Sequence, residues 1–250
     1  PLHSSIAHRQ PTAMNSPLTM TARSAPSRAV APRAARLTPL MAALAAVLPL
    51  AVLAQGRPPL PATVPVPASS WRINGSGGTV PVNLANSRGG VDQSIRQDSQ
   101  RAIYQWQSFD IGANSSVTFD MALKGASALN RVTGSTSPSQ IFGKLSATNG
   151  GEIYLINANG ILFGRGAQVN TGSLVASALN ISDAEFLSGL TNSLLYTWQT
   201  PAFKYDGAPE DFIDSKNFVR VEEGASLVTA NGGRVFLFAK RVDNAGSIST

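Results

Sequence analysis

Short apolar runs separated by turn residues make up most of the chain from Trp71 onward. Typical runs are "VTF" at 117–119, "EIYLI" at 152–156 and "RVFLF" at 234–238, and Gly, Asn and Ser residues stand between them. Short, closely spaced apolar runs with such corners are typical of β-strands, and a helical period is hard to sustain across them. The pattern therefore predicts an all-β fold.

One segment carries the signals of a helix. Ser182 is followed three residues later by Glu185, which is the spacing of a capping box, and Gly189 is a residue suited to a helix end. We therefore expect a short helix that begins after Ser182.

An internal repeat narrows the architecture. The sequence "NGGEIYLI" at 149–156 recurs as "NGGRVFLF" at 231–238, which is 82 residues later. Such an offset suits several stacked coils of a β-solenoid, although one pair of copies does not give the number of coils. The favoured fold is a right-handed parallel β-helix, in which Val, Ile, Leu and Phe fill the interior and Asn and Gly form the corners.

Between the two copies of the repeat lies an aromatic-rich segment, residues 191–219. It is too apolar for a free linker, so we expect it to fold back over the surface of the solenoid as an excursion. Packing explains its aromatic residues most simply. A ligand-binding surface, with Tyr196 and Trp198 as its contact residues, is the alternative.

The beginning of the chain has the organisation of a secretory signal. A basic stretch, Arg33–Arg36, precedes an apolar run at 37–54 that ends in small residues. We expect cleavage after Ala54. A transmembrane anchor is the alternative, but Pro39 and Pro49 interrupt the apolar run.

Three parts of the chain follow from these patterns. Residues 1–54 form the predicted signal and targeting segment, residues 55–70 a proline-rich extended linker, and residues 71–250 the β-helix domain. The last ten residues, "RVDNAGSIST", keep the solenoid pattern and lack a capping helix. We therefore expect the domain to continue into a longer chain.

Charge at first suggests a nucleic-acid partner, because the net charge is +6. Its distribution removes that suggestion. Residues 1–54 hold five basic residues and no acidic ones, which leaves 15 basic and 14 acidic residues downstream. The predicted mature protein is nearly neutral, and we expect no nucleic-acid partner.

Candidate chemistry is sparse. The chain has no cysteine, and its two histidines, His3 and His8, precede the predicted cleavage site. Catalysis by Ser/His/Asp or Cys/His groups and zinc sites of His or thiolate ligands are therefore not available to the mature protein. We expect no enzyme activity, no cofactor and no metal. A solvated acidic loop is the favoured interpretation of the carboxylates Asp206, Glu210, Asp211 and Asp214.

Four segments together resemble the filamentous haemagglutinin family, in its N-terminal two-partner secretion domain. These are "RAIYQWQSFDIGANSSVTF" at 101–119, "LNRVTG" at 129–134, "GGEIYLINANGILFGRGAQVNTGSLVASALNIS" at 150–182 and "NGGRVFLFAKRVDNAGSI" at 231–248. The resemblance implies a parallel β-helix with an N-terminal cap and extra-helical elements. It also implies a bacterial exoprotein that is recognised in the periplasm by an Omp85-type outer-membrane transporter. In that family, the secretion domain crosses the outer membrane unfolded and seeds folding of the β-helix outside.

The resemblance also assigns candidate secretion residues. The family's Asn-Pro-Asn-Gly-Ile motif falls on Asn157, Ala158, Asn159, Gly160 and Ile161, with Ala158 in place of proline. The second family motif, Asn-Pro-Asn-Leu, is absent. At the position where the family carries that second motif, this chain has Asn130, Arg131, Val132 and Thr133. This segment resembles the high-molecular-weight adhesin branch of the family. A purely structural role, as a corner and as a strand with a turn, remains open for both segments.

Three functions therefore compete. The first is a secretion-targeting and folding-nucleation module of a secreted or cell-surface exoprotein, with host-cell contact left to a downstream region. The second is an adhesive module that itself contacts a host glycan or receptor. The third is a polysaccharide-cleaving β-helix enzyme, although the candidates Arg131, Arg165, Arg234 and Lys240 are scattered in the sequence.

Overall fold

The computed structural model describes residues 58–74, 80–189 and 202–250. The predicted signal segment, and Tyr196 and Trp198 of the proposed ligand surface, lie outside these residues. Within the described ranges, no helix has the length and apolar character needed to cross a membrane.

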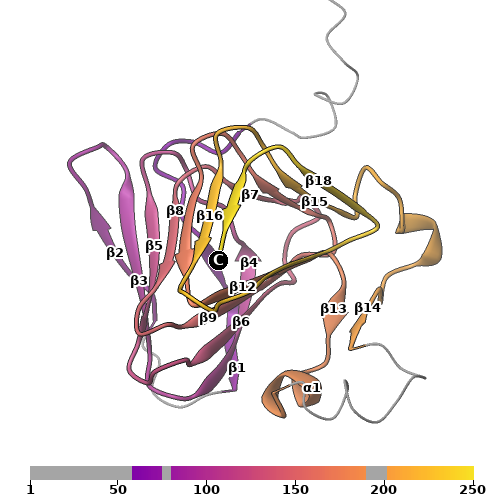
Figure 1. Ribbon diagram of the computed structural model, residues 1–250, viewed down its shortest axis with the longest axis horizontal. Coiled ribbons are helices and arrows are strands. Elements are labelled where there is room, and N and C mark those ends of the chain that lie inside the picture. Colours follow the sequence, from indigo (N-terminus) through magenta and orange to yellow (C-terminus); the bar gives the residue numbers. More distant parts are fainter. Residues whose placement is uncertain (1–57, 75–79, 190–201) are drawn as a thin grey trace, which may run out of the picture. The chain divides into compact units, whose positions relative to one another are not determined.

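The described residues form a parallel β-solenoid of about six turns, which confirms the all-β prediction (Figure 1). Three sheets run along it. Sheet A contains β1 (Val66–Asn74), β4 (Arg101–Ser108), β6 (Ser127–Val132), β9 (Glu152–Ile156), β12 (Ser173–Ser177) and β17 (Val235–Phe238). Sheet B contains β2 (Val82–Ala85), β3 (Val91–Gln97), β5 (Ser116–Met121), β8 (Lys144–Ala147), β11 (Gln168–Thr171), β16 (Ser226–Thr229) and β19 (Ser247–Ser249). Sheet C contains β7 (Ser139–Ile141), β10 (Ile161–Phe163), β15 (Phe218–Val221) and β18 (Arg241–Asn244).

The interior is built from apolar residues stacked in register. In sheet B, Val117 pairs with Leu145, which pairs with Val169 on the next coil. All three are at most 2% exposed. Alternate residues of a strand point to opposite faces, so each short apolar run supplies one layer of the core. This stacking explains why the runs recur without helical spacing.

The N-terminal cap is antiparallel. β1 pairs antiparallel with β4, and β2 pairs antiparallel with β3, whereas the coils that follow are parallel. Part of the segment predicted as a linker lies against the first coil, because Gly112 N donates to Thr63 O at 2.9 Å and Asn114 N to Pro61 O at 3.1 Å. Proline carbonyl oxygens still accept hydrogen bonds, so a proline-rich segment can be packed in place.

The repeated Asn-Gly-Gly marks the corner between sheets B and A. Gly150 and Gly232 have φ of 66° and 80°, which a side chain disfavours. The next glycine lies under a neighbouring coil, since a Cβ on Gly233 would lie 2.0 Å from Gly172 O. β9 pairs with β12 and β12 with β17, so the two copies of the repeat are two coils apart.

An excursion interrupts the coil between β12 and β15 and lies outside the sheets (Figure 1). Its described elements are β13 (Asn180–Ile181), α1 (Asp183–Leu187), β14 (Phe203–Lys204) and η2 (Pro209–Asp211). α1 has the predicted capping box, in which Glu185 N donates to Ser182 Oγ and Ser182 N to Glu185 Oε2. The excursion begins at β13, about ten residues before the predicted 191.

Candidate functional site

The first candidate segment, residues 157–161, forms the corner between β9 and β10. Gly160 N donates to Asn157 O at 2.9 Å, which closes a four-residue turn with Ala158 at its second position. The Asn157 side chain is 1% exposed and donates to Ser137 O and Ser139 Oγ, both at 3.1 Å. The corner is therefore tied to the coil that precedes it.

Asn159 adds a further bond to that coil. Its amide nitrogen donates to Ser135 O at 2.9 Å, and its backbone N–H donates to Asn157 Oδ1 at 3.0 Å. Ile161 is fully buried in β10, and Asn159 is partly exposed. Of these five residues, Ala158 alone is exposed. The polar side chains of this segment therefore bind neighbouring residues of the protein and are largely withdrawn from solvent.

A side chain at Gly160 would clash with the next coil. Its φ is 105°, and a Cβ would lie 2.7 Å from Phe218 Cε1 and 2.8 Å from Lys216 O. The next coil therefore packs directly on the backbone of the corner.

Asn217 is a functional candidate that the sequence reasoning missed. Ile161 pairs with Val219, so Asn159 and Asn217 each lie two residues before paired positions. Asn217 is fully buried, and its amide nitrogen donates to Ala178 O at 2.8 Å, while its oxygen accepts from Lys240 N at 2.8 Å. The sequence feature that could have identified Asn217 is its position directly before the apolar run "FVRV", because asparagine also precedes the apolar runs of the repeat.

The second candidate segment, residues 130–133, covers the end of β6. Asn130 is fully buried and accepts from Trp106 Nε1 at 3.0 Å, while its amide donates to Tyr154 O at 3.2 Å. Val132 is 8% exposed, and Thr133 is exposed just beyond the strand. Asn130 thus joins neighbouring coils through the sheet, as Asn157 does at the corner.

Arg131 points outward and binds the excursion. Its Nε donates to Asn180 Oδ1 at 2.9 Å, its Nη2 to Ile181 O at 2.7 Å, and its Nη1 pairs with Asp183 at 2.8 Å. The Arg131 side chain is 12% exposed. A guanidinium satisfied by three partners at this depth fixes the excursion to β6.

The structure brings the two candidate segments together. Arg131 pairs with Ile156 in the parallel ladder between β6 and β9, and Asn157 follows Ile156 directly. Val132 and Asn157 therefore continue neighbouring strands. Sequence spacing alone did not predict this proximity.

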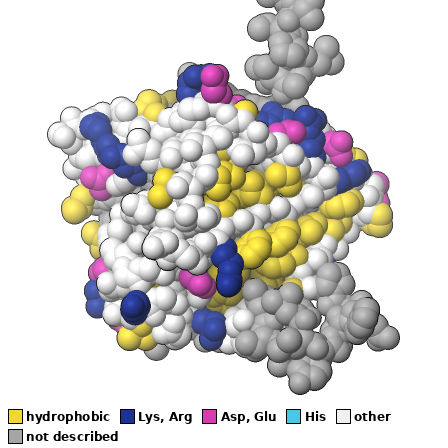
Figure 2. Space-filling view, in the orientation of Figure 1, with side chains coloured by type: hydrophobic (Ala, Val, Ile, Leu, Met, Phe, Trp, Pro, Cys, Tyr) yellow, Lys and Arg dark blue, Asp and Glu magenta, His cyan; other side chains and the backbone are white. Residues whose placement is uncertain are grey.

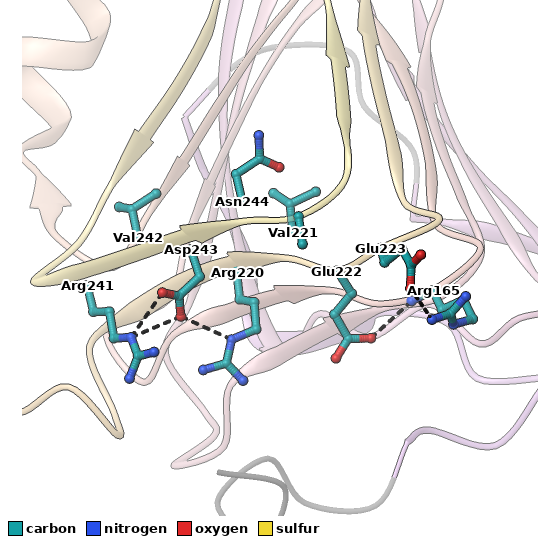
Figure 3. A pocket seen from close by; sticks show the side chains of 10 residues that line it. Arg165, Arg220, Val221, Glu222, Glu223, Arg241, Val242, Asp243 and Asn244 are labelled. Carbon is teal, nitrogen blue, oxygen red and sulfur yellow. Dashed lines mark hydrogen bonds and ion pairs between the residues drawn. The ribbon is translucent and has the colours of Figure 1, made fainter. Parts of the chain in front are cut away.

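A surface hollow of about 740 Å³ lies beside β15 and β18 (Figure 3). Its charges are paired: Asp243 lies 3.2 Å from Arg220 Nε and 2.9 Å from Arg241 Nε, and Glu223 lies 2.8 Å from Arg165. Because each guanidinium has a carboxylate partner, the hollow presents little uncompensated charge to an anionic ligand.

Three of the four carboxylates in the predicted acidic loop have partners, and Glu210 is exposed. Asn180 Nδ2 donates to Asp206 at 2.6 Å, Asp211 pairs with Lys216, and Asp214 lies 3.8 Å from Lys240. In the described ranges, no three His, Cys, Asp or Glu residues are grouped so that they could hold a metal ion.

Two groups have pKa values shifted by packing. Burial, with a smaller contribution from the charge of Glu152, raises the pKa of Tyr154 to about 12. Burial also raises the pKa of Asp110, against the opposing effect of the hydrogen bond from Gln140 N at 2.8 Å. Both shifts have desolvation as their main cause, as expected for side chains packed in a structural frame.

Comparison with known proteins agrees with this architecture. A model of the TPS secretion domain family matches residues 73–250. The crystal structure of the HMW1 secretion domain from Haemophilus influenzae matches with a TM-score of 0.51 and 27% identity, covering 70% of this chain and 40% of that one.

Curated relatives are longer proteins. A heme/hemopexin-binding protein of Haemophilus influenzae is 40% identical over 107 residues, which are 43% of this chain and 11% of that protein. A second heme/hemopexin-binding protein of this species is 40% identical over 106 residues, again 11% of its length. The match thus covers about a tenth of each curated relative.

The comparisons confirm the predicted family. The match to the HMW1 secretion domain agrees with the resemblance of residues 130–133 to the high-molecular-weight adhesin branch. Domains of this family engage an outer-membrane transporter partner, and their exoproteins reach the cell surface through the periplasm. Since the family model matches 73–250, well over half of the residues, this chain belongs to the TPS secretion domain family of two-partner-secreted exoproteins.

Proposed function

We propose that this chain is the secretion-targeting and folding-nucleation module of a large exoprotein, recognised by the periplasmic domains of an Omp85-type transporter. It reaches the periplasm after signal-peptide cleavage near Ala54 and acts without enzyme activity, cofactor or nucleic acid. Contact with a host-cell surface belongs to a downstream region of the exoprotein.

The observation that carries the proposal is the way the corner is built. Asn157 and Asn159 donate three side-chain hydrogen bonds to residues 135–139 of the preceding coil. Each coil of a solenoid is stabilised chiefly by its neighbours, so bonds that set the register of one coil on another favour stepwise growth of the stack. A corner of this kind supports nucleation of the fold.

Burial decides which residues a transporter can contact in the folded domain. Asn157 and Asn130 are at most 1% exposed, whereas Ala158 and Thr133 are exposed. The asparagines are therefore accessible to the transporter in the unfolded chain, before the corner forms. In the folded domain they act by shaping the corner.

Secretion of the full chain with its transporter tests the proposal. We expect the double variant Asn157→Ala/Asn159→Ala to reach the medium at a reduced level and to bind the transporter's periplasmic domains less well. Asn170→Ala is the matched control, because Asn170 is an exposed asparagine on β11 of sheet B. Normal export and binding of the double variant would refute a role for the corner.

Direct adhesion is a second candidate, favoured by the aromatic side chains of β17. Figure 2 shows hydrophobic side chains gathered on the face that carries the last strands. Phe236 is 44% exposed, and its ring stacks at 5.8 Å on the Phe238 ring. A glycan array probed with the full chain and with Phe236→Ala and Trp198→Ala tests this candidate, and binding that both substitutions leave unchanged would count against it.

A further inference from the structure

The outer face of sheet A carries an apolar row. Ile103 pairs with Leu129, and Leu129 pairs with Tyr154. These three side chains belong to a small hydrophobic cluster separate from the interior of the solenoid. The outer face of sheet B differs, since its corresponding row is Ser94, Thr118 and Ser146.

A short part of the excursion covers this row. We call residues Asn180–Leu187 (β13 and α1) the cover. Phe186 is 2% exposed and meets the Tyr154 ring edge-on at 5.2 Å, and Ile181 is 1% exposed in the same cluster. Ile103 and Leu129 are fully buried as a result of this arrangement on the outside of the solenoid.

Within the part of the chain that the structure describes, the cover has few bonds of its own. α1 contains five residues, and β13 and β14 pair at two positions, Asn180 with Lys204 and Ile181 with Phe203. A helix this short is not stable alone. β6, by contrast, pairs at six positions with β4 and at five with β9. The cover is therefore the part of this face with the smallest local stability.

Arg131 is the main polar attachment of the cover. Its guanidinium holds Asn180, Ile181 O and Asp183, which are the first residues of the cover. The excursion is closed separately at its base, because Asn217 bonds Ala178 O at 2.8 Å. The cover can therefore detach while the coil beneath it stays intact.

We propose that the cover is a conformational device clasped by Arg131, which opens as a unit without unfolding of the solenoid and so exposes the apolar row Ile103, Leu129 and Tyr154. Opening replaces a closed polar surface by an apolar strip on sheet A. The proposal concerns the motion of the folded chain and stands independently of transporter recognition.

The chain contains no cysteine, which makes a thiol-accessibility experiment direct. Leu129→Cys places a thiol under the cover, and Leu145→Cys places one in the solenoid interior; both leucines are fully buried. We expect a soluble thiol reagent to label Leu129→Cys at least about tenfold faster than Leu145→Cys, because local opening costs less free energy than unfolding of the solenoid. Equal labelling rates at the two positions would overturn the proposal.

The clasp is tested by adding Arg131→Met to the Leu129→Cys variant. Labelling should accelerate by about tenfold, and the labelling of Leu145→Cys should not change. Arg96→Met is the matched control, because Arg96 pairs with Asp98 and Asp120 away from the cover. Equal acceleration at both thiols, or none at Leu129→Cys, would contradict the role of Arg131.

Hydrogen exchange of the unmodified chain gives a measurement that needs no variant. The backbone N–H groups of Phe186, Ser188 and Gly189 bond within the helix and its end. We expect these amides to exchange together and faster than those of β9 and β12. Protection of the cover equal to that of these strands would also overturn the proposal.

Discussion

Asn217 donates a hydrogen bond from its side-chain amide to the carbonyl oxygen of Ala178, 2.8 Å away, although the two residues are 39 positions apart. This bond closes the base of the excursion. Through Lys240 N, the same side chain also reaches the following coil. A single buried asparagine thus connects the two ends of the insertion and binds the coil that follows it.

Asn217→Ala should lower the free energy of unfolding by about 1–3 kcal/mol, because the substitution leaves the buried Ala178 O, and the partly buried Lys240 N, without their partner. Denaturant unfolding followed by circular dichroism measures the change. The control Asn170→Ala, at an exposed position, should have little effect. Equal losses for the two variants would contradict the role given to Asn217.

Ala158→Pro should stabilise the protein by about 0.4–1 kcal/mol, because proline restricts the unfolded chain and suits the second position of a turn. The turn bond from Gly160 N to Asn157 O at 2.9 Å does not involve the Ala158 N–H. A raised Tm in a thermal melt is the expected result. A lowered Tm would show that the backbone at Ala158 does not accept the fixed φ of proline.

Gly160→Ala should destabilise the protein by about 2–4 kcal/mol, since the added Cβ combines an unfavourable φ with contacts to Phe218 and Lys216. Gly166→Ala separates these causes. Gly166 also has a positive φ, 89°, but a Cβ there would come no closer than 3.9 Å to another atom. Denaturant titration of both variants should therefore show the larger loss at Gly160, and the reverse order would disprove close packing at this corner.

Tyr154 should ionise at a pH near 12 in the folded protein, because burial raises its pKa to about 12 from a usual value of 10.0. A raised pKa in the folded state means that the associated stability is complete below pH 10 and is lost as the pH rises toward 12. The absorbance of tyrosinate in an alkaline titration measures the ionisation. Phe186→Ala should move this pKa toward 10, because it removes a ring packed on Tyr154.

Tyr154→Phe provides the matching control. It should remove the tyrosinate absorbance step near pH 12 and reduce the loss of stability between pH 10 and 12. If this variant kept the same alkaline loss of stability, other groups would be responsible for it.

Local patterns were sufficient for the elements that depend on neighbouring residues. The Asn-Gly-Gly repeat predicted corners, and its glycines do adopt the positive φ and the close packing that corners require. Ser182 and Glu185 predicted the capped helix because both partners of a capping box lie within one turn.

Contacts between coils could not be predicted in this way. The bonds of Arg131 to residues 180–183 join positions about fifty apart, and residues 61–63 bond to 112–114 over a similar distance. Many pairings of this kind are compatible with one pattern of strands. The excursion's true start and the packing of part of the predicted linker therefore became visible only in the structure.

The sequence by itself determined the β-solenoid, its Asn and Gly corners and the family, because stacked short strands impose a local alternation and special turn residues at each corner. Tertiary structure decided which side chains face solvent, that segments 130–133 and 157–161 adjoin, and that Arg131 holds the cover on sheet A. These features depend on the register between coils, which is set by packing over the whole stack and not by any one segment.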